Sequence, residues 1–214
     1  VPGVTGSWTG TSPSLPDFIR LEICGHTNQE WTPTLRCELL IPGCSEGALH
    51  LSHLSDPQSI EQGTPLCTNG AGHTAQSYWR VYDLCQSPFD LSDGLELEAV
   101  QIAIAESDPG PGFSNLPLTL RLYADPDGGS ISPISSLQLL HQQEFLVPAI
   151  SDQHLCLNLT TALEINCDTS LVVEIALSDA SVAEHLLALG SNSSPETAEG
   201  WWSAPDCGVL QPTP

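Results

Sequence analysis

The sequence predicts an all-β protein, an antiparallel β-sandwich or jelly roll held together by disulfide bonds. Three observations lead to this prediction: short runs of alternating apolar and polar residues, turn-forming residues between the runs, and eight cysteines spread over 214 residues. Alternation with a period of two gives each strand one core-facing and one solvent-facing side, which is typical of antiparallel sheets. Roughly ten such strands at this spacing indicate a sandwich.

The alternating runs follow one another along the chain, separated by turn sequences. They span residues 17–24, 35–41, 77–84, 95–105, 118–123, 136–140, 154–159 and 171–177. Asp-Pro-Gly-Pro-Gly at 108–112 and Asp-Pro-Asp-Gly-Gly at 125–129 carry the residue types that tight turns require. Residues 181–189 form too short a run to decide between a short helix and a turn followed by a strand.

Composition changes near residue 60, and this change divides the chain into two predicted parts. Residues 1–16 are rich in Pro, Gly, Ser and Thr, and residues 17–54 predict a hairpin-like pair of strands and a third short strand. We therefore expect residues 1–60 to form an extended arm with a small hairpin region that serves in assembly, and residues 61–214 to form the sandwich. Val4 and Trp8 have the same parity in the arm, so both side chains can anchor it to another subunit.

The chain carries 26 acidic residues and only four basic ones, all of them arginines, for a net charge of −22. Charged residues make up 14% of the chain, so the negative charge reflects missing bases rather than a surface crowded with carboxylates. The charge balance excludes nucleic acid and anionic lipid as partners, because almost nothing can neutralise phosphate. All four arginines lie in or beside predicted strands, where we expect surface ion pairs. No apolar run approaches the roughly 20 residues that a membrane-inserted helix needs.

The cysteines are scattered, without a Cys-x-x-Cys pair or the Cys/His spacing of a zinc site. They are Cys24, Cys37, Cys44, Cys67, Cys85, Cys156, Cys167 and Cys207. An even number of dispersed cysteines predicts up to four disulfides and an oxidising compartment. We therefore expect a secreted, extracellular protein at the cell surface, from which any signal peptide has been removed.

Three blocks of sequence carry a resemblance to a known kind of domain. The first is the loop Cys67-Thr-Asn-Gly-Ala-Gly-His-Thr with the aromatic strand Ser77-Tyr-Trp-Arg-Val-Tyr that follows it. The second is Leu95-Glu-Leu-Glu-Ala-Val-Gln-Ile-Ala-Ile-Ala-Glu with Leu118-Thr-Leu-Arg-Leu-Tyr, and the third is Leu187-Ala-Leu-Gly-Ser-Asn with Gly200-Trp-Trp-Ser-Ala-Pro-Asp-Cys-Gly. Together they resemble a β-sandwich domain of secreted bacterial surface proteins, which also occurs as an accessory module beside extracellular proteases.

The resemblance implies a non-catalytic module over about 140 of the 214 residues. It also implies that Cys67 and Cys207, each beside a matched block, pair and tie the ends of the domain together. Cys85 and the pair Cys156 and Cys167 are additions to the pattern, and we expect Cys156 and Cys167 to close a short loop. The pairing of Cys24, Cys37, Cys44 and Cys85 stays open, because four bridges allow about 105 connectivities.

The sequence contains no recognisable catalytic motif. The sequence has seven histidines but neither a Gly-x-Ser-x-Gly elbow nor a His-Glu-x-x-His helix. His50 and His53 would share one face of a helix, but their segment predicts a strand, in which they point to opposite sides. The acidic residues show no focal pair of the kind that glycosidases use. We therefore expect a protein without enzymatic activity.

Two acidic turns predict a calcium site. Asp125 and Asp127 stand two residues apart in one glycine turn, and Asp90 and Asp93 lie in a similar turn. Calcium binds to several oxygen ligands on flexible loops, and such turns supply them. The alternative is that Asp and Gly serve only as turn formers.

Trp201 and Trp202 are adjacent, so in a strand they face opposite sides. We expect one to enter the core and the other to be exposed, where it stacks on a sugar or packs against a partner. Glycans are therefore candidate ligands, with simple packing as the alternative. Asn158 and Asn192 begin triplets that match the N-glycosylation pattern.

These observations together predict a non-enzymatic extracellular structural protein, the subunit of a self-assembling filament or surface layer. In such a homo-oligomer the N-terminal arm adds a strand to the next copy, a contact that propagates head to tail. The alternatives are a carbohydrate-binding or adhesion module and an accessory domain of a secreted hydrolase.

Overall fold

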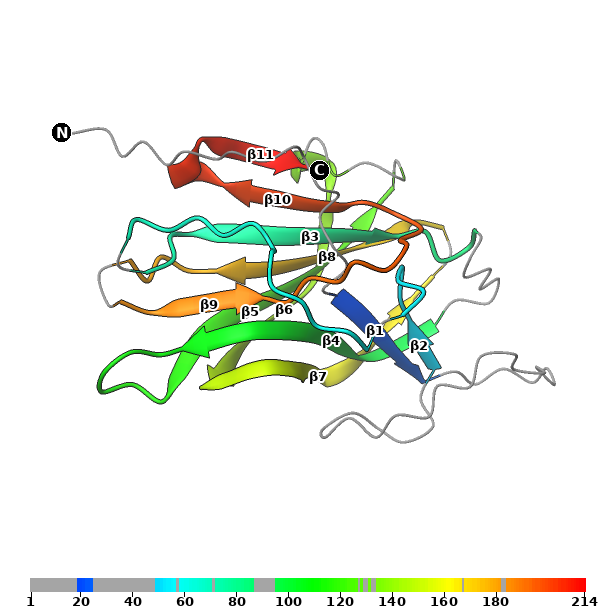
Figure 1. Cartoon of the computed structure of the whole chain (residues 1–214). Coiled ribbons are helices and arrows are strands. Elements are labelled where there is room, and N and C mark those ends of the chain that lie inside the picture. The colour runs from blue at the N-terminus through cyan, green and yellow to red at the C-terminus, as the bar shows by residue number, and fades with distance from the viewer. Residues whose placement is uncertain are drawn as a thin grey trace.

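The chain folds into two antiparallel β-sheets packed face to face, as the computed structural model shows (Figure 1). The structure describes residues 19–24, 49–56, 58–70, 72–86, 95–126, 128, 131, 134–166, 168–181 and 184–214. Within these ranges lie eleven strands and two short 3-10 helices, Ile134–Ser136 and Pro205–Cys207. The predicted all-β sandwich is confirmed.

The two sheets are named A and B. Sheet A has six strands, in the order β11 (Val209–Thr213), β10 (Gly200–Ala204), β3 (Gln76–Tyr82), β8 (Ser170–Leu177), β5 (Asn115–Asp125) and β6 (Gln138–Pro148). Sheet B has five, with β2 (Leu49–Leu51), β1 (Ile19–Cys24), β4 (Leu95–Asp108) and β7 (Ile150–Ile165) in that order, and β9 (Leu186–Leu189) also paired with β4. All pairings between these strands are antiparallel.

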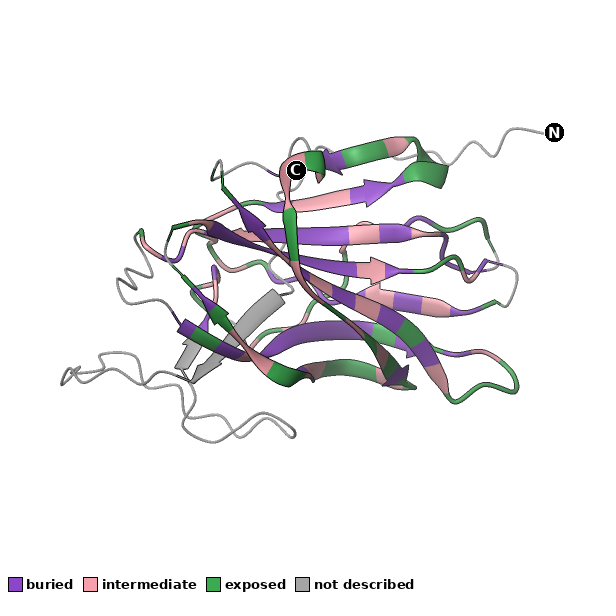
Figure 2. Cartoon of the chain, turned by 180° about the vertical axis from the view of Figure 1, so that it is seen from behind, coloured by how far each residue is buried: buried purple, intermediate pink, exposed green. Residues whose placement is uncertain are grey.

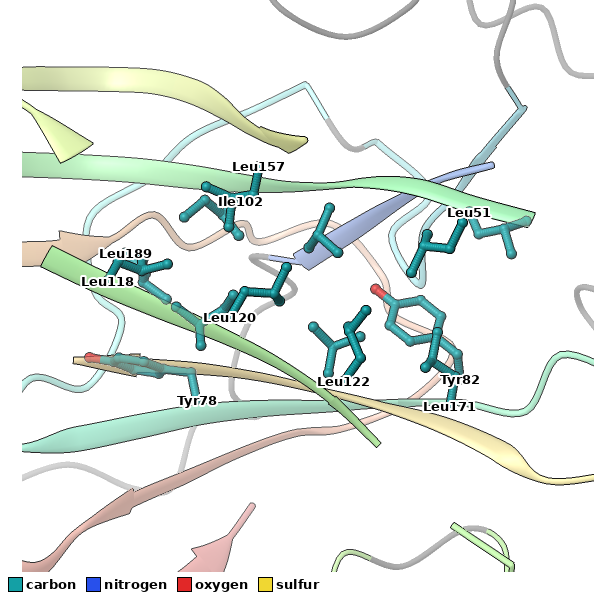
Figure 3. Packing of buried hydrophobic residues seen from close by; sticks show 14 of the residues in the cluster. Leu51, Tyr78, Tyr82, Ile102, Leu118, Leu120, Leu122, Leu157, Leu171 and Leu189 are labelled. Carbon is teal, nitrogen blue, oxygen red and sulfur yellow. The ribbon is translucent and has the colours of Figure 1, made fainter. Parts of the chain in front are cut away.

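Alternate residues of the strands form much of the core between the sheets, as the period-two patterns predict (Figure 3). On β5 the core residues are Leu116, Leu118, Leu120 and Leu122. Burial of a leucine or tyrosine side chain stabilises the fold by roughly 1.5–3 kcal/mol. Figure 2 shows the same alternation as stripes of buried and less buried residues along the strands.

Several strands are longer than the sequence indicates. The run expected at 136–140 overlaps the start of β6, which begins at Gln138 and continues to Pro148, and the run at 154–159 is the middle of the 16-residue β7. Both strands lie at sheet edges, where polar residues such as Gln142 and Glu144 are exposed and interrupt the apolar alternation. The expected run at 181–189 ends in a strand, β9, and the run at 35–41 lies outside the described residues.

The described part of the first sixty residues belongs to the sandwich rather than to a separate region. β1 pairs with β4 as well as with β2, so it is an integral strand of sheet B. Further along, Glu61 exchanges backbone hydrogen bonds of 2.8 and 2.7 Å with Ser191. A Cβ on Gly190 would come within 2.6 Å of the Ile60 side chain, so this contact needs glycine. Val4 and Trp8 lie outside the described residues.

A disulfide joins Cys67 to Cys207, as the resemblance implies, with Cα atoms 6.0 Å apart. It connects the segment before β3 to the helix between β10 and β11, and so closes the outer edge of sheet A. Cys85 and Cys156 are disulfide-bonded as well. Cys37, Cys44 and Cys167 and the side chain of Cys24 lie outside the described residues, so their predicted pairings stay predictions.

Candidate functional site

The predicted calcium ligands are only partly within the described residues. Asp125 ends β5 and is buried, whereas Asp90, Asp93 and Asp127 lie outside the described ranges. In the part of the chain that the structure describes, no three His, Cys, Asp or Glu side chains come together as a metal site requires. Calcium binding therefore remains a prediction.

His53 has a structural position that leaves no nitrogen for a metal. Its Nε2 atom lies 2.9 Å from the carbonyl oxygen of Val81 and therefore carries the proton, while Nδ1 lies 2.8 Å from the Thr197 hydroxyl. The ring also packs against Tyr82, with ring centres 4.7 Å apart. These contacts connect the segment after β2 to β3 and to the 191–199 loop. The side chain of His50 lies outside the described residues.

His73 is buried where the loop after Cys67 meets the start of β9. With the proton on Nε2, the Nδ1 atom accepts a hydrogen bond from the backbone N–H of Leu187 at 3.2 Å. With a proton on Nδ1, it donates instead to the carbonyl oxygen of His185 at 3.1 Å. Protonation of Nδ1 would therefore exchange an accepted hydrogen bond for a donated one and leave the Leu187 N–H without this acceptor.

We expect the stability of this region to decrease at acidic pH. Burial lowers the pKa of His73 below its usual 6.5, and nearby His185 acts in the same direction, against the carbonyls of His185 and Ser178 and the charge of Asp179. The unfolded chain then binds a proton more readily than the folded one, so stability is lost as the pH falls from 6.5 to the lowered pKa.

The measurement is the urea midpoint of wild type and His73→Asn at a series of pH values around 6.5. Asparagine keeps an acceptor for the Leu187 N–H but has no titrating group. The difference in urea midpoint between the two proteins should therefore become smaller as the pH falls. A constant difference would contradict the prediction. Comparison with the variant also removes the general effect of carboxylate protonation, which is common to both chains.

The two predicted glycosylation residues have different environments. Asn158 is exposed on β7, so its site remains a prediction. Asn192 is buried, and its amide nitrogen donates to the carbonyl oxygens of Asp56 at 2.7 Å and Ser59 at 2.8 Å. Its amide oxygen accepts from the Ser194 N–H at 2.8 Å. Asn192 is therefore a structural residue that fixes the loop, and it is not accessible to glycosylation in the folded protein.

Trp201 and Trp202 face opposite sides of β10, as predicted, but neither is fully exposed. Trp202 packs against the core between the sheets, and its indole N–H donates to the side-chain oxygen of Gln76 at 3.3 Å. Trp201 lies on the outer face of sheet A, half-buried beside a second apolar cluster that includes Trp79. The expected exposed tryptophan is thus a half-exposed one.

Strand register places Trp201 in a line of side chains that crosses the outer face of sheet A. Trp201 is opposite Trp79, and Trp79 is opposite Glu174. Glu174 in turn is opposite Arg121, which is opposite Gln142. These five residues, from five neighbouring strands, are called the polar-aromatic row.

Hydrogen bonds fix the charged centre of the row. The Glu174 carboxylate is 4% exposed and accepts from the hydroxyls of Ser77 and Tyr123, each at 2.7 Å. Arg121 lies 3.1 Å from Glu174 through Nη1 and donates through Nε to Gln142 at 3.0 Å. This network holds a carboxylate and a guanidinium in place at the surface of the sheet.

The electrostatics of the row keep Arg121 charged and Tyr123 neutral. Partial burial of Arg121 disfavours its charge, but the adjacent Glu174 carboxylate outweighs this, so the pKa of Arg121 is raised. Burial raises the pKa of Tyr123, and its hydrogen bond to Glu174 raises it further. Tyr123 therefore acts as a hydrogen-bond donor at all ordinary pH values.

The polar-aromatic row has large apolar side chains on one side and small side chains on the other. On one side Ile131, Ile134 and Leu137 belong to one apolar cluster with Trp79, Val172 and Tyr123. On the other side the next line of residues is small: Ser77 pairs with Ala176, which pairs with Thr119. The large side chains of the row therefore lie between an apolar cluster and a line of small side chains.

A separate groove of about 640 Å³ lies between residues 61–63 and the 191–199 loop. Two of its carboxylates are already engaged: Glu61 accepts from the Ser193 hydroxyl at 2.6 Å, and Glu196 pairs with Arg80 at 2.7 Å. Arg80 is fully buried, so the expectation that all four arginines form surface ion pairs is wrong for this one. These bonds anchor the 191–199 loop, and the groove is a consequence of that anchoring. The polar-aromatic row is therefore the stronger candidate site.

Comparison of the chain with protein-family models, with curated proteins and with solved structures finds no match in any of the three. None of the helices in the described ranges is long and apolar enough to span a membrane. The assignment of the candidate site is therefore based on its geometry alone.

Sequence reasoning identified Trp201 but not its neighbours in the row. Arg121 and Glu174 each interrupt an apolar strand pattern at an outward-facing position, which is the one signal that the sequence contains. Their pairing depends on the register of β5 against β8, which the sequence does not reveal.

Proposed function

We propose that this protein is a non-enzymatic extracellular structural protein whose copies assemble by strand addition at the free edge of β6. The observation that carries the proposal is that β6 is eleven residues long and lies at the end of sheet A. Within the described residues it pairs only with β5. A free strand edge of this length is a template for pairing with another chain.

β6 lacks most of the devices that normally protect an edge strand. Lysine, arginine, proline and bulges commonly protect such edges. β6 has no lysine or arginine, and its proline is the last residue of the strand. Its one register irregularity is near Leu139, so residues 142–148 are regular. Two apolar side chains of β6 are strongly exposed, Leu139 at 50% and Leu146 at 69%.

The other described edges are less suited to strand addition. β11 has only five residues and contains Pro212, which cannot donate to a neighbouring strand. The pairing of β7 with β4 is interrupted between Asn158 and Leu163. Gln143 of β6 bonds the carbonyl oxygen of Asn158 at 3.1 Å and the N–H of Thr160 at 3.0 Å, and so holds this interruption in place.

The proposed donor strand is the N-terminal arm with Val4 and Trp8, which lies outside the described residues. Strand addition would provide backbone hydrogen bonds along β6, and the apolar anchors would provide specificity. A net charge of −22 opposes the contact between copies. Assembly is therefore expected to need a divalent cation or an acidic pH, at which carboxylates are neutralised.

We expect the double variant Leu139→Lys/Leu146→Lys to assemble at least about tenfold more weakly than wild type, because charges on an edge strand oppose pairing. Electron microscopy and light scattering, with calcium and at acidic pH, measure the assembly. Leu210→Lys is the matched control, since Leu210 is also 69% exposed but lies on β11. Deletion of residues 1–10 tests whether the N-terminal arm is the donor strand, and it should abolish assembly.

Three outcomes would refute the proposal. The first is a wild-type protein that stays a monodisperse monomer at high concentration under every condition. The second is an equal loss of assembly in the Leu210→Lys control. The third is normal assembly of the double variant, which would place the contact elsewhere.

A further inference from the structure

We propose that the polar-aromatic row binds a neutral carbohydrate chain lying across the strands of sheet A. This site is distinct from the β6 edge, because it crosses five strands on the outer face of the sheet and includes only Gln142 from β6. It adds a recognition function to the structural one, and it does not depend on whether copies assemble.

The row holds hydrogen-bond donors that a ligand can use. A guanidinium has five N–H donors, whereas the described partners of Arg121 are three: Glu174, Gln142 and Tyr123. Within the described ranges no residue accepts a hydrogen bond from the indole N–H of Trp201. Side-chain exposure is 32% for Arg121, so a ligand can reach its guanidinium. These donors match the hydroxyl and ring oxygens of a sugar.

Preorganisation of the charged centre favours binding over mere packing. Glu174 is held by Ser77, Tyr123 and Arg121, so it fixes the Arg121 guanidinium without contacting the ligand itself. A guanidinium held in one geometry loses little conformational freedom when it binds, which increases affinity.

The shape and chemistry of the face fit a sugar chain. Apolar side chains of Ile131, Ile134 and Leu137 lie on one side of the row, and the small residues Ser77, Ala176 and Thr119 lie on the other. A pyranose has an apolar C–H face and a polar rim of hydroxyls. The half-exposed indole of Trp201 provides a flat apolar surface on which the C–H face can stack. The donors of the row can form hydrogen bonds with the hydroxyl groups.

Charge selects a neutral ligand over an anionic one. Arg121 is already neutralised by Glu174, so the row presents no net positive charge. The chain as a whole carries −22 and repels sulfated or uronic-acid polymers. A polysaccharide of neutral hexoses or pentoses needs no positive charge for binding and is not repelled by the negative charge of the chain.

The test is isothermal titration of the full chain with neutral hexose and pentose oligosaccharides four to six sugars long, with tryptophan fluorescence as a second signal. We expect saturable binding to at least one of them. Trp201→Ala should weaken that binding at least about 30-fold, as the loss of a central aromatic contact does. Arg121→Gln should weaken it about tenfold, since a charge-assisted hydrogen bond is lost.

Trp202→Phe is the matched control, because Trp202 is the next residue of β10 and packs on the inner side. Its binding should equal that of wild type. Urea unfolding of each variant separates a lost contact from a lost fold, and Trp201→Phe gives a variant with an intact aromatic surface if Trp201→Ala unfolds.

Absence of saturable binding to every neutral oligosaccharide up to about 10 mM would overturn the proposal. So would binding only to uronic-acid or sulfated chains, or wild-type affinity in folded Trp201→Ala, or, where that variant unfolds, wild-type affinity in folded Arg121→Gln. These results bear on the row alone, because assembly is measured separately with the β6 variants.

Discussion

Removal of the Cys67–Cys207 disulfide is expected to lower the free energy of unfolding by about 5 kcal/mol. The bridge spans 140 residues of sequence, so in the unfolded chain it removes much of the freedom of a very long loop. In the folded protein it joins the segment before β3 to the 3-10 helix after β10, and β3 and β10 are neighbouring strands of sheet A. The double variant Cys67→Ala/Cys207→Ala removes the bridge without leaving a reactive thiol.

Urea unfolding of this double variant and of wild type, both without reductant, measures the difference. The other bridged cysteines, Cys85 and Cys156, stay oxidised in both proteins and provide the internal control. A loss of less than about 1 kcal/mol would mean that the unfolded chain is already restrained, for example by the remaining bridges.

Arg80→Met is expected to destabilise the protein by about 3–5 kcal/mol, because it leaves a charge without its buried partner. Arg80 has the same parity as Tyr78 and Tyr82 on β3, so it enters the interior of the sandwich and is fully buried. There it donates to Glu196 at 2.7 Å and to the carbonyl oxygen of Ala198 at 3.0 Å. Loss of these bonds also releases the 191–199 loop.

Thermal and urea unfolding of Arg80→Met, with Arg121→Met as the matched control, test this expectation. Arg121 is 32% exposed, and solvent weakens its ion pair, so its replacement should cost clearly less stability. Equal losses for the two variants would contradict the role assigned to Arg80. The combination of Arg80→Met with Glu196→Leu should recover part of the loss, because it removes the unpaired carboxylate as well.

The fold class was predictable because it depends on local periodicity. Alternation along Leu118-Thr-Leu-Arg-Leu-Tyr marks one buried and one outer face whatever the strand is paired with. The ends of strands were less predictable: β6 and β7 extend well beyond their apolar runs, since an edge strand needs fewer buried residues. The role of β1 in sheet B, rather than in a separate hairpin, follows from a pairing with β4 about 80 residues later in the sequence.

The candidate site was predictable only in part. Trp201 could be assigned to the opposite side of β10 from Trp202 because adjacent residues in a strand always alternate. The sequence by itself thus determined an all-β sandwich, its turns, its acidic character and, through a resemblance, one disulfide. The tertiary structure alone decided that Arg80 is buried against Glu196 and that Trp201, Glu174 and Arg121 share one row. The physical reason is that strand register between distant segments is set by the packing of the whole core, whereas the alternation within a strand is set by the backbone.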